Sequence, residues 1–339
     1  MFYNGIHALR AIAALLVVLH HAFQRGNALG LTQLQFEFGA WGVDLFFVIS
    51  GFVMAKGVQG RQGWQAASGF IGRRLARVVP LYWAATLLLT MVYFVLPQLF
   101  GNLSIAPGDL PRSLLFWPYE DGRGLVRPIV SQGWTLIFEM FFYALVCLGL
   151  LLGRGRAMRL TAGLIAGLIA AGYALAWDGG KTPFILSGIL VEFLFGALVF
   201  HLTAHAQRLG SAQRWALALA GVGFSFALAD LASLGLGRGL AGGLGAFAVV
   251  LAAAGWRLPR LPYPLHLLGD ASYAIYLFHG MGFSLTGKLL GVAHWPSAAL
   301  AVLALTLGAT ACGIAVHLLV EKRLQHYAIV SLTRIGVIA

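Results

Sequence analysis

Apolar blocks about as long as a membrane crossing recur along this 339-residue sequence, separated by short polar breaks. A helix needs about 20 apolar residues to cross roughly 30 Å of hydrocarbon, so such blocks can be counted directly. Ten are found, at residues 8–25, 40–57, 78–98, 132–152, 160–177, 184–203, 213–230, 239–255, 268–287 and 296–319. Only 10% of the residues are charged, against about 25% in soluble domains. The sequence therefore predicts an all-α, polytopic membrane protein of about ten transmembrane helices.

These helices and their short loops account for nearly every residue, so we expect one integral membrane domain over residues 1–339 and no separate soluble domain. The first apolar stretch has no small-residue cleavage site, which indicates a retained first helix. The longest connection, residues 99–131, contains four prolines and four glycines. Such a composition predicts an irregular segment on the outer face, where it would cap a cavity.

The chain has 23 Lys and Arg residues against 11 Asp and Glu, a net charge of +12. In a membrane protein, basic residues concentrate in the cytoplasmic loops, so the excess indicates topology and not a nucleic-acid partner. With the N-terminus inside, 16 of the 23 basic residues fall on the cytoplasmic side and 7 on the outer side. This asymmetry predicts that both termini are cytoplasmic in a multi-pass protein of the bacterial inner membrane.

Ionisable side chains at membrane depth cost a few kcal/mol or more, so each is a candidate functional residue. In the first predicted span, His21 follows Arg10 by 11 residues, which is three helical turns plus about 20° and places both on one face about 16 Å apart. His20 points elsewhere. Asp44, in the second span, is expected at a depth similar to that of His21, where the two side chains could pair.

Two further spans have polar faces. In the fourth span, polar residues at helical spacing form a stripe that consists of Gln132, Thr135, Glu139 and Tyr143. In the ninth, Ser272 and His279 are seven residues apart on one face, with Asp270 at the cytoplasmic rim. Topology and helical phase together predict that His21, Asp44, Glu139 and His279 lie between the midplane and the outer surface.

Four arginines are expected near the cytoplasmic surface: Arg10, Arg73, Arg74 and Arg77. Arginine binds phosphate through planar paired donors, so a basic inner mouth suits a phosphate-bearing cytosolic ligand. A buried histidine beside a carboxylate suits proton abstraction, because the carboxylate stabilises the imidazolium that forms.

Each of these groups also has a purely structural interpretation. The arginines of the third span could be positive-inside anchors, and His21 or His279 could simply bond a neighbouring helix. Structural contacts are favoured for Glu192, His20, His201, His205 and His317. Cys147 and Cys312 are expected to be small packed residues within helices, and no metal site is predicted.

Five segments resemble, in order, the motifs of the acyltransferase-3 membrane family, the O-acyltransferases of bacterial surface carbohydrates. They are LRAIAALLVVLHH at 9–21, GVDLFFVISGFVM at 42–54, FIGRRLARVVPLYW at 70–83, GWTLIFEMFFYAL at 133–145 and LLGDASYAIYLFHG at 267–280. The resemblance places the family's functional residues on Arg10, His21, Asp44, Arg73, Arg74, Arg77, Glu139, Ser272, Tyr273 and His279. The chain is similar to compact exopolysaccharide-type members, because it lacks the additional periplasmic domain of some relatives.

The resemblance implies transfer of an acyl group, most often acetyl, from cytosolic acyl-CoA to a hydroxyl of an extracytoplasmic or lipid-linked glycan. The inner arginines would bind the CoA phosphates, and His21 would be the general base, oriented by Asp44 or Glu139. His279 with Ser272 would line the acyl pocket. No permanently bound cofactor is implied, and the expected partners are acyl-CoA, the glycan acceptor, membrane lipids and polysaccharide-assembly proteins.

Two other classes of function stay open from the sequence. A transporter or flippase for a glycan or lipid-linked sugar would also have polar residues near the midplane, but would not depend on acyl-CoA. We find neither an internal repeat nor an inverted pair of broken helices, which are the usual signs of such a transporter. A noncatalytic subunit of a polysaccharide-assembly complex would retain product acylation after His21→Ala.

Overall fold

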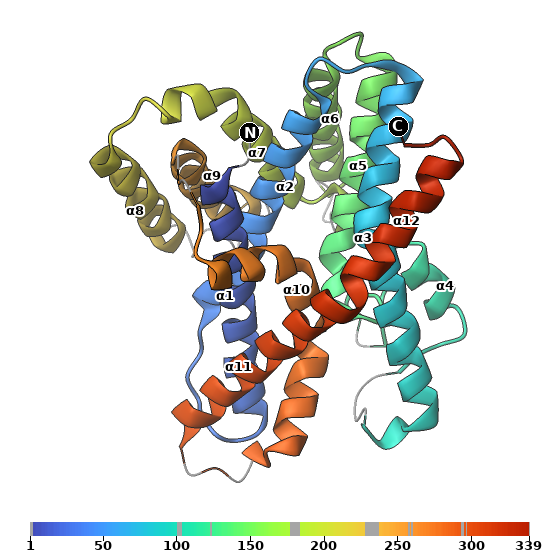
Figure 1. The fold of residues 1–339 in the computed structure, drawn as a ribbon, viewed down its shortest axis with the longest axis vertical. Coiled ribbons are helices and arrows are strands. Elements are labelled where there is room, and N and C mark those ends of the chain that lie inside the picture. Colours follow the sequence, from blue (N-terminus) through green and yellow to red (C-terminus); the bar gives the residue numbers. More distant parts are fainter. Residues whose placement is uncertain are drawn as a thin grey trace. The chain divides into compact units, whose positions relative to one another are not determined.

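The computed structural model describes residues 3–99, 104–122, 124–176, 184–227, 237–256, 258, 260–292, 295 and 297–338. These residues form α-helices and short 3-10 helices, with one isolated β-bridge and no strand among them (Figure 1). The α-helices are α1 (Asn4–Ala28), α2 (Gly42–Val58), α3 (Gly63–Val95), α4 (Asp109–Leu114), α5 (Trp134–Leu152), α6 (Ala157–Ala176), α7 (Val191–Ala206), α8 (Ser211–Ala227), α9 (Gly237–Gly255), α10 (Tyr263–Leu289), α11 (Ala298–Val316) and α12 (Lys322–Arg334).

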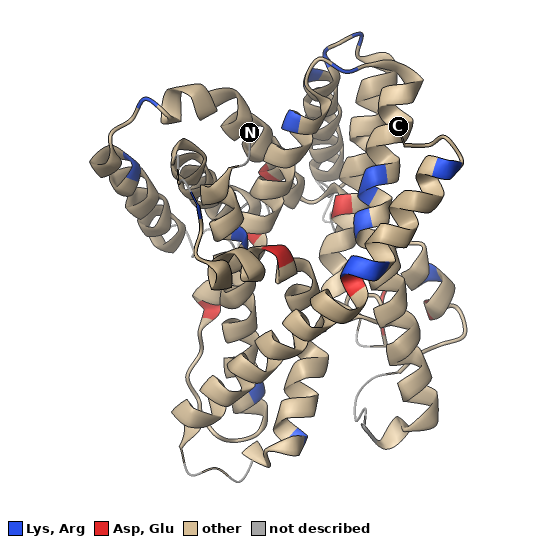
Figure 2. Ribbon diagram, in the orientation of Figure 1, with Lys and Arg blue, Asp and Glu red and all other residues tan. Residues whose placement is uncertain are grey.

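Within the described part of the chain, seven helical stretches are long and apolar enough to cross a membrane. They are Asn4–Ala28, Glu37–Val58, Gly63–Val95, Ser131–Leu152, Ala157–Leu175, Gly188–Ala206 and Ala298–Arg334. Charged residues are sparse along the helices (Figure 2). The prediction of an all-α, polytopic membrane protein is therefore confirmed. The count of ten and the cytoplasmic termini stay predictions, and the predicted span ends at 177, 228–230 and 296 lie outside the described residues.

Two predicted helix boundaries are wrong. The third span was expected at 78–98, whereas α3 begins 15 residues earlier, at Gly63. The last was expected to end at 319, whereas helical structure continues through the π-helical turn His317–Glu321 into α12. Both extensions contain Arg residues and a Gln, which interrupt a hydropathy pattern but favour helix. Hydropathy thus located the apolar part of each helix but not its ends.

The connection 99–131 is more ordered than its composition predicts. It contains α4, and three hydrogen bonds converge on Ser113. The Tyr82 hydroxyl of α3 donates to the Ser113 carbonyl at 3.0 Å, the Ser113 and Tyr119 hydroxyls are bonded at 2.8 Å, and the Ile129 amide donates to Ser113 Oγ at 3.0 Å. These bonds fasten the connection to α3. Its place on the outer face stays a prediction, and residues 100–103 and 123 lie outside the described part.

The chain divides into two compact units, each discontinuous in sequence. The first comprises Met1–Lys56 and Val191–Leu319, and the second Gly57–Leu190 and Val320–Ala339. The prediction that residues 1–339 form one integral membrane domain stays a prediction.

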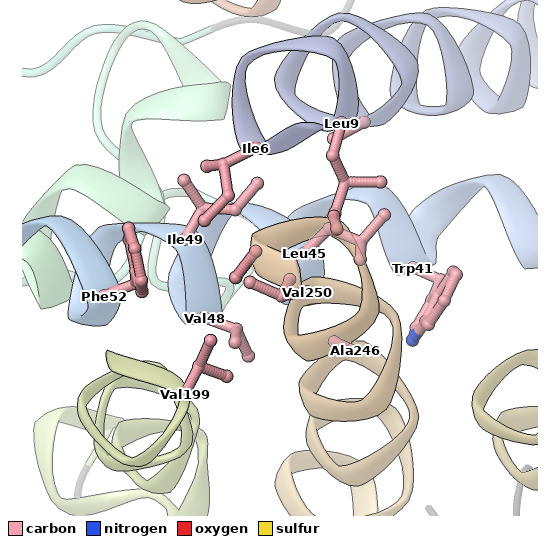
Figure 3. Packing of buried hydrophobic residues seen from close by; sticks show 13 residues of the cluster. Ile6, Leu9, Trp41, Leu45, Val48, Ile49, Phe52, Val199, Ala246 and Val250 are labelled. Atoms are coloured by element: carbon pink, nitrogen blue, oxygen red, sulfur yellow. The ribbon is translucent and has the colours of Figure 1, made fainter. Parts of the chain in front are cut away.

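The core of the first unit is formed by α1, α2, α7 and α9 (Figure 3). Its buried side chains include Leu9 of α1, Val48 of α2, Val199 of α7 and Val250 of α9. Burying such side chains keeps neighbouring transmembrane helices in dense contact, which drives their association in lipid.

Glycines shape this packing unevenly. A Cβ placed on Gly243 of α9 would lie 2.8 Å from the Glu192 side chain of α7, so a larger residue cannot fit there. By contrast, a Cβ on Gly163 or Gly167 of α6 would meet no described atom within 4 Å. Glycine therefore permits close helix packing at Gly243 of α9, whereas Gly163 and Gly167 of α6 have no described neighbour that close.

Candidate functional site

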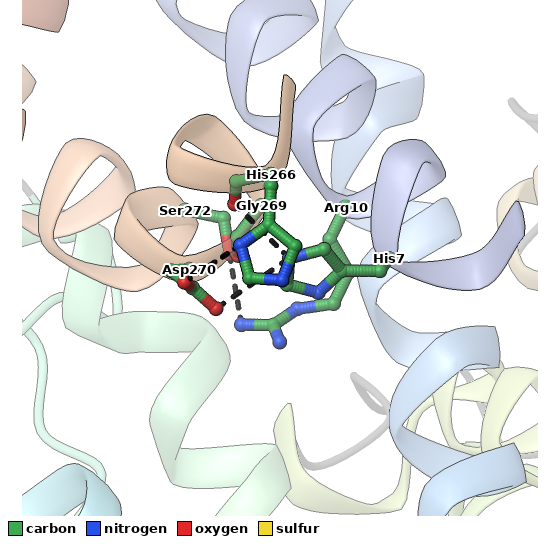
Figure 4. Close-up of polar contacts among 6 residues, drawn as sticks. All are labelled: His7, Arg10, His266, Gly269, Asp270 and Ser272. Atoms are coloured by element: carbon green, nitrogen blue, oxygen red, sulfur yellow. Dashed lines mark hydrogen bonds and ion pairs between the residues drawn. The ribbon is translucent and has the colours of Figure 1, made fainter. Parts of the chain in front are cut away.

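Helices α1 and α10 pack side by side in the first unit and bring four of the predicted site residues together in pairs. The Arg10 guanidinium donates from Nη2 to Ser272 Oγ at 2.8 Å (Figure 4). Farther along both helices, the rings of His21 and His279 stack with centroids 4.9 Å apart and an interplanar angle of 14°. The two contacts follow the same order on both helices, so α1 and α10 run parallel, as expected of two spans that start on one side of the membrane.

Ser272 lies where α10 contacts Arg10 of α1. Its side chain is fully buried, and its hydroxyl also donates to the Gly269 carbonyl at 2.9 Å. The expected role of Ser272 in an acyl pocket with His279 stays a prediction. In the structure its hydroxyl accepts from Arg10, whose long side chain reaches across to α10 from the neighbouring helix. Tyr273, the next residue, is half-buried.

A chain of three hydrogen bonds fixes the proton on the His21 ring. His20 Nδ1 lies 2.8 Å from the Phe36 carbonyl oxygen, which can only accept, so His20 Nδ1 is the donor and Nε2 the acceptor. The Gln24 amide then donates from Nε2 to His20 Nε2 at 2.9 Å. Its oxygen consequently accepts from His21 Nδ1 at 2.8 Å. The neutral His21 ring is thus protonated on Nδ1, and Nε2 is its basic nitrogen.

His279 has the same tautomer but a different environment. Its Nδ1 donates to the Tyr276 carbonyl at 2.6 Å, so Nε2 is again the basic nitrogen. The side chain of His279 is only 1% exposed, whereas His21 is half-buried. Of the two stacked imidazoles, His21 is therefore the one better placed to meet a substrate.

Sequence reasoning missed Gln24 and set His20 aside as a structural contact. His20 is bonded to Gln24, and through Gln24 it orients His21. The spacing was visible in the sequence, because Gln24 is three residues after His21 and four after His20, the separations at which side chains meet on a helix. A polar residue at position 24 could therefore have indicated a partner for the two histidines.

Asp44 is buried near the start of α2, where the positive end of the helix dipole stabilises a carboxylate. Its carboxylate packs against Gly242 of α9, where any larger side chain would overlap it. The Trp41 indole donates to the Gly242 carbonyl at 2.9 Å and holds α2 and α9 together beside this contact. The expected pairing of Asp44 with His21 stays a prediction.

In the second unit, α3 and α5 bring Glu139 to the arginine cluster. The Tyr143 hydroxyl donates to Glu139 Oε1 at 2.5 Å, and the Tyr143 ring meets the Phe70 ring edge-to-face at 6.1 Å. The Arg74 guanidinium lies over the same Phe70 ring, 5.8 Å from its centroid, and interacts electrostatically with Glu139. We expected Glu139 to be well separated from the arginines. They meet because α3 begins early, so that Arg74 lies about three turns inside this helix.

The other two arginines of the cluster differ in exposure. Arg73 is exposed, whereas Arg77 is half-buried and its carbonyl accepts a hydrogen bond of 3.3 Å from Gln325 of α12. The arginine cluster thus presents one exposed guanidinium and two that are partly covered. Such an arrangement can bind an anion through several donors at once.

The fold therefore defines a polytopic helical membrane protein in which buried ionisable groups meet on paired helices. Residues 3–318 match the model of an acyltransferase domain, that of the acyltransferase-3 family, and the chain belongs to this family. It is accordingly an acyltransferase that transfers groups other than aminoacyl groups. The resemblance noted in the sequence is confirmed.

Two curated relatives cover most of the chain. It is 35% identical over 317 residues to the exopolysaccharide production protein ExoZ of Rhizobium meliloti (strain 1021), covering 91% of this chain and 94% of that protein. It is 28% identical over 309 residues to the protein named "Putative membrane-bound transacylase BcsY" of Komagataeibacter xylinus, covering 85% of this chain and 74% of that protein. No solved structure matches the chain.

Proposed function

We propose that this acyltransferase moves an acyl group, acetyl in the first instance, from cytosolic acyl-CoA to a hydroxyl of an exopolysaccharide or its lipid-linked precursor. Family membership supports acyl transfer, and the name of the relative that matches over nearly its whole length supports the exopolysaccharide acceptor. The protein would lie in the bacterial inner membrane, where a donor from the cytosol and an acceptor at the outer face can meet.

The observation on which the mechanism rests is the hydrogen-bond chain through His20 and Gln24. It leaves Nε2 of His21 as a base, and a positioned histidine base contributes about 10²–10⁴-fold to a proton transfer. Nε2 of His21 would take the proton of the glycan hydroxyl while the hydroxyl oxygen attacks the thioester carbonyl carbon of acyl-CoA. As the C–O bond forms and the C–S bond breaks, the imidazolium returns the proton to the sulfur, releasing CoA as a thiol.

The remaining candidates have supporting roles in this proposal. Arg10, held by Ser272, and the cluster of Arg73, Arg74 and Arg77 would bind the phosphates of CoA. His279 would hold the His21 ring in place by stacking and line the acyl pocket, near Tyr273. Asp44 or Glu139 would orient the His21 ring and stabilise the positive charge that develops on it. No bound cofactor or metal takes part in these steps.

Radiolabelled acyl-CoA tests the proposal. Purified protein in proteoliposomes should move label from acetyl-CoA to an added oligosaccharide, and surface polysaccharide from a deletion strain should lack the ester by mass spectrometry. A flippase would instead move lipid-linked sugar across the bilayer with no acyl-CoA present. Label transfer that does not occur with acetyl, succinyl or longer acyl-CoA donors would contradict the proposed reaction.

A further inference from the structure

Beside the Arg10 end of the helix pair, the structure gathers three side chains of metal-binding type. His7 comes from α1, and His266 and Asp270 come from α10, so the set joins two helices of one unit (Figure 4). One ligand atom from each lies within 4.8 Å of the other two. We propose that His7, His266 and Asp270 bind a divalent transition-metal ion such as Zn²⁺. This site is separate from the acyl-transfer chemistry assigned to His21.

The distances are close to those of a zinc site. His266 Nδ1 lies 3.1 Å from one Asp270 carboxylate oxygen, and His7 Nε2 lies 3.5 Å from the other. Zinc bonds of about 2.0–2.1 Å with tetrahedral angles place ligand atoms about 3.4 Å apart. The two contacts bracket this value, and since all three ligand atoms lie within 4.8 Å of one another, side-chain rotations would be needed to bring them around one ion.

Local sequence explains why the ligands meet. His266 and Asp270 are one helical turn apart, so both project from one face of α10. Gly269, between them, admits α1, because a Cβ there would lie only 2.6 Å from His7 Nε2. His7 is 259 residues from His266 in the chain, so no sequence pattern indicates that the three residues meet.

The ligand types of His7, His266 and Asp270 suit a cation of intermediate hardness. Two imidazoles and one carboxylate are the ligands preferred by zinc and related divalent transition metals, with the remaining position filled by water. His7 is buried, but the side chains of His266 and Asp270 are 46% and 41% exposed, so an ion has an entry path and room for that water.

Two neighbouring features set the affinity. His7 Nε2 donates to the His266 carbonyl at 3.0 Å, so metal binding requires the other tautomer of the neutral ring, with the proton on Nδ1. Arg10 is a nearby cation, but its guanidinium is directed to Ser272 Oγ. Its repulsion makes the site weaker than a four-ligand structural zinc site, in keeping with an ion that clamps α1 to α10 reversibly.

The test is metal binding by the full chain, purified in detergent without a polyhistidine tag and stripped with a chelator. We expect about one Zn²⁺ per protein by elemental analysis, and with Co²⁺ the visible absorption of a tetrahedral site. His266→Ala and Asp270→Asn change exposed positions and should each reduce retained Zn²⁺ at least about tenfold, because each removes a first ligand. His205→Ala is the matched control, since His205 is an exposed histidine of α7 in the same unit.

Retention of Zn²⁺ by His266→Ala at the level of His205→Ala would overturn the proposal and assign the ion to other histidines. So would a wild-type protein that binds no Zn²⁺ and gives no Co²⁺ spectrum. Because the readout is bound metal, it is independent of whether acyl transfer is confirmed.

Discussion

Arg10 and Ser272 are 262 residues apart in the chain, and a hydrogen bond of 2.8 Å joins the guanidinium of one to the hydroxyl of the other. Ser272 is fully buried, so this bond fixes where the arginine points. A phosphate-binding arginine gains from such positioning, because its donors are already oriented when the ligand arrives. The serine thus acts through the arginine.

Ser272→Ala should weaken acyl-CoA binding and leave kcat nearly unchanged. A hydrogen bond to a charged group contributes about 1.5–3 kcal/mol, so the KM for acyl-CoA should rise at least about tenfold. Ser284→Ala, an exposed serine of the same helix, is the control. A fall in kcat with an unchanged KM would mean that Ser272 acts in the chemistry and not in donor binding.

Gln24→Leu should lower kcat with little change in the KM for acyl-CoA, because the leucine cannot hold Nδ1 of His21 as a donor. Both tautomers of His21 then become populated and the ring loses its orientation. We expect His20→Ala to have the same kind of effect at smaller size, since Gln24 retains its bond to His21. Steady-state kinetics over a range of pH measure both, and a Gln24→Leu enzyme with wild-type kcat would refute the positioning role.

Replacing Arg73, Arg74 and Arg77 together with Gln should weaken acyl-CoA binding in proteoliposomes without unfolding the protein. Phosphate contacts of arginines that water reaches are screened by salt, most of all at the exposed Arg73, so the difference from wild type should shrink as ionic strength rises. Arg208→Gln, at an exposed position between α7 and α8 of the first unit, is the control. Equal affinities at every salt concentration would return the three arginines to the role of topological anchors.

Cysteine labelling tests the predicted topology. Cysteines placed at 153–159 should be protected from a membrane-impermeant thiol reagent added to the periplasmic side, and cysteines placed at 104–122 should react. The basis is the 16 to 7 asymmetry of Lys and Arg residues. Labelling of 153–159 from the periplasm would reverse the orientation.

The sequence predicted the fold class well because hydropathy reports the solvent of each segment directly. It placed the boundaries poorly at α3 and α12, where basic residues continue a helix beyond its apolar part. Helical phase put Arg10 and His21 on one face of α1, and Ser272 and His279 on one face of α10, and these two faces meet in the structure. It could not show which α10 residue each one meets, because that depends on side-chain length and helix packing.

Three features were beyond a single sequence. The meeting of Glu139 with Arg74 depends on where α3 begins, and the His7, His266 and Asp270 set depends on a contact between distant segments. The role of Gln24 depends on the proton order along several hydrogen bonds, which begins at a backbone carbonyl. Each requires coordinates, because the residue types alone are compatible with ordinary surface or packing roles.

The most direct test of the account is the rate of acyl transfer by His21→Ala. Purified enzyme, radiolabelled acetyl-CoA and an acceptor oligosaccharide give the rate, and His205→Ala controls for loss of an exposed histidine. With His21 as the general base, its removal should lower kcat by about 10²–10⁴-fold while the protein folds and binds acyl-CoA as before. Transfer by His21→Ala at the rate of His205→Ala would contradict the mechanism.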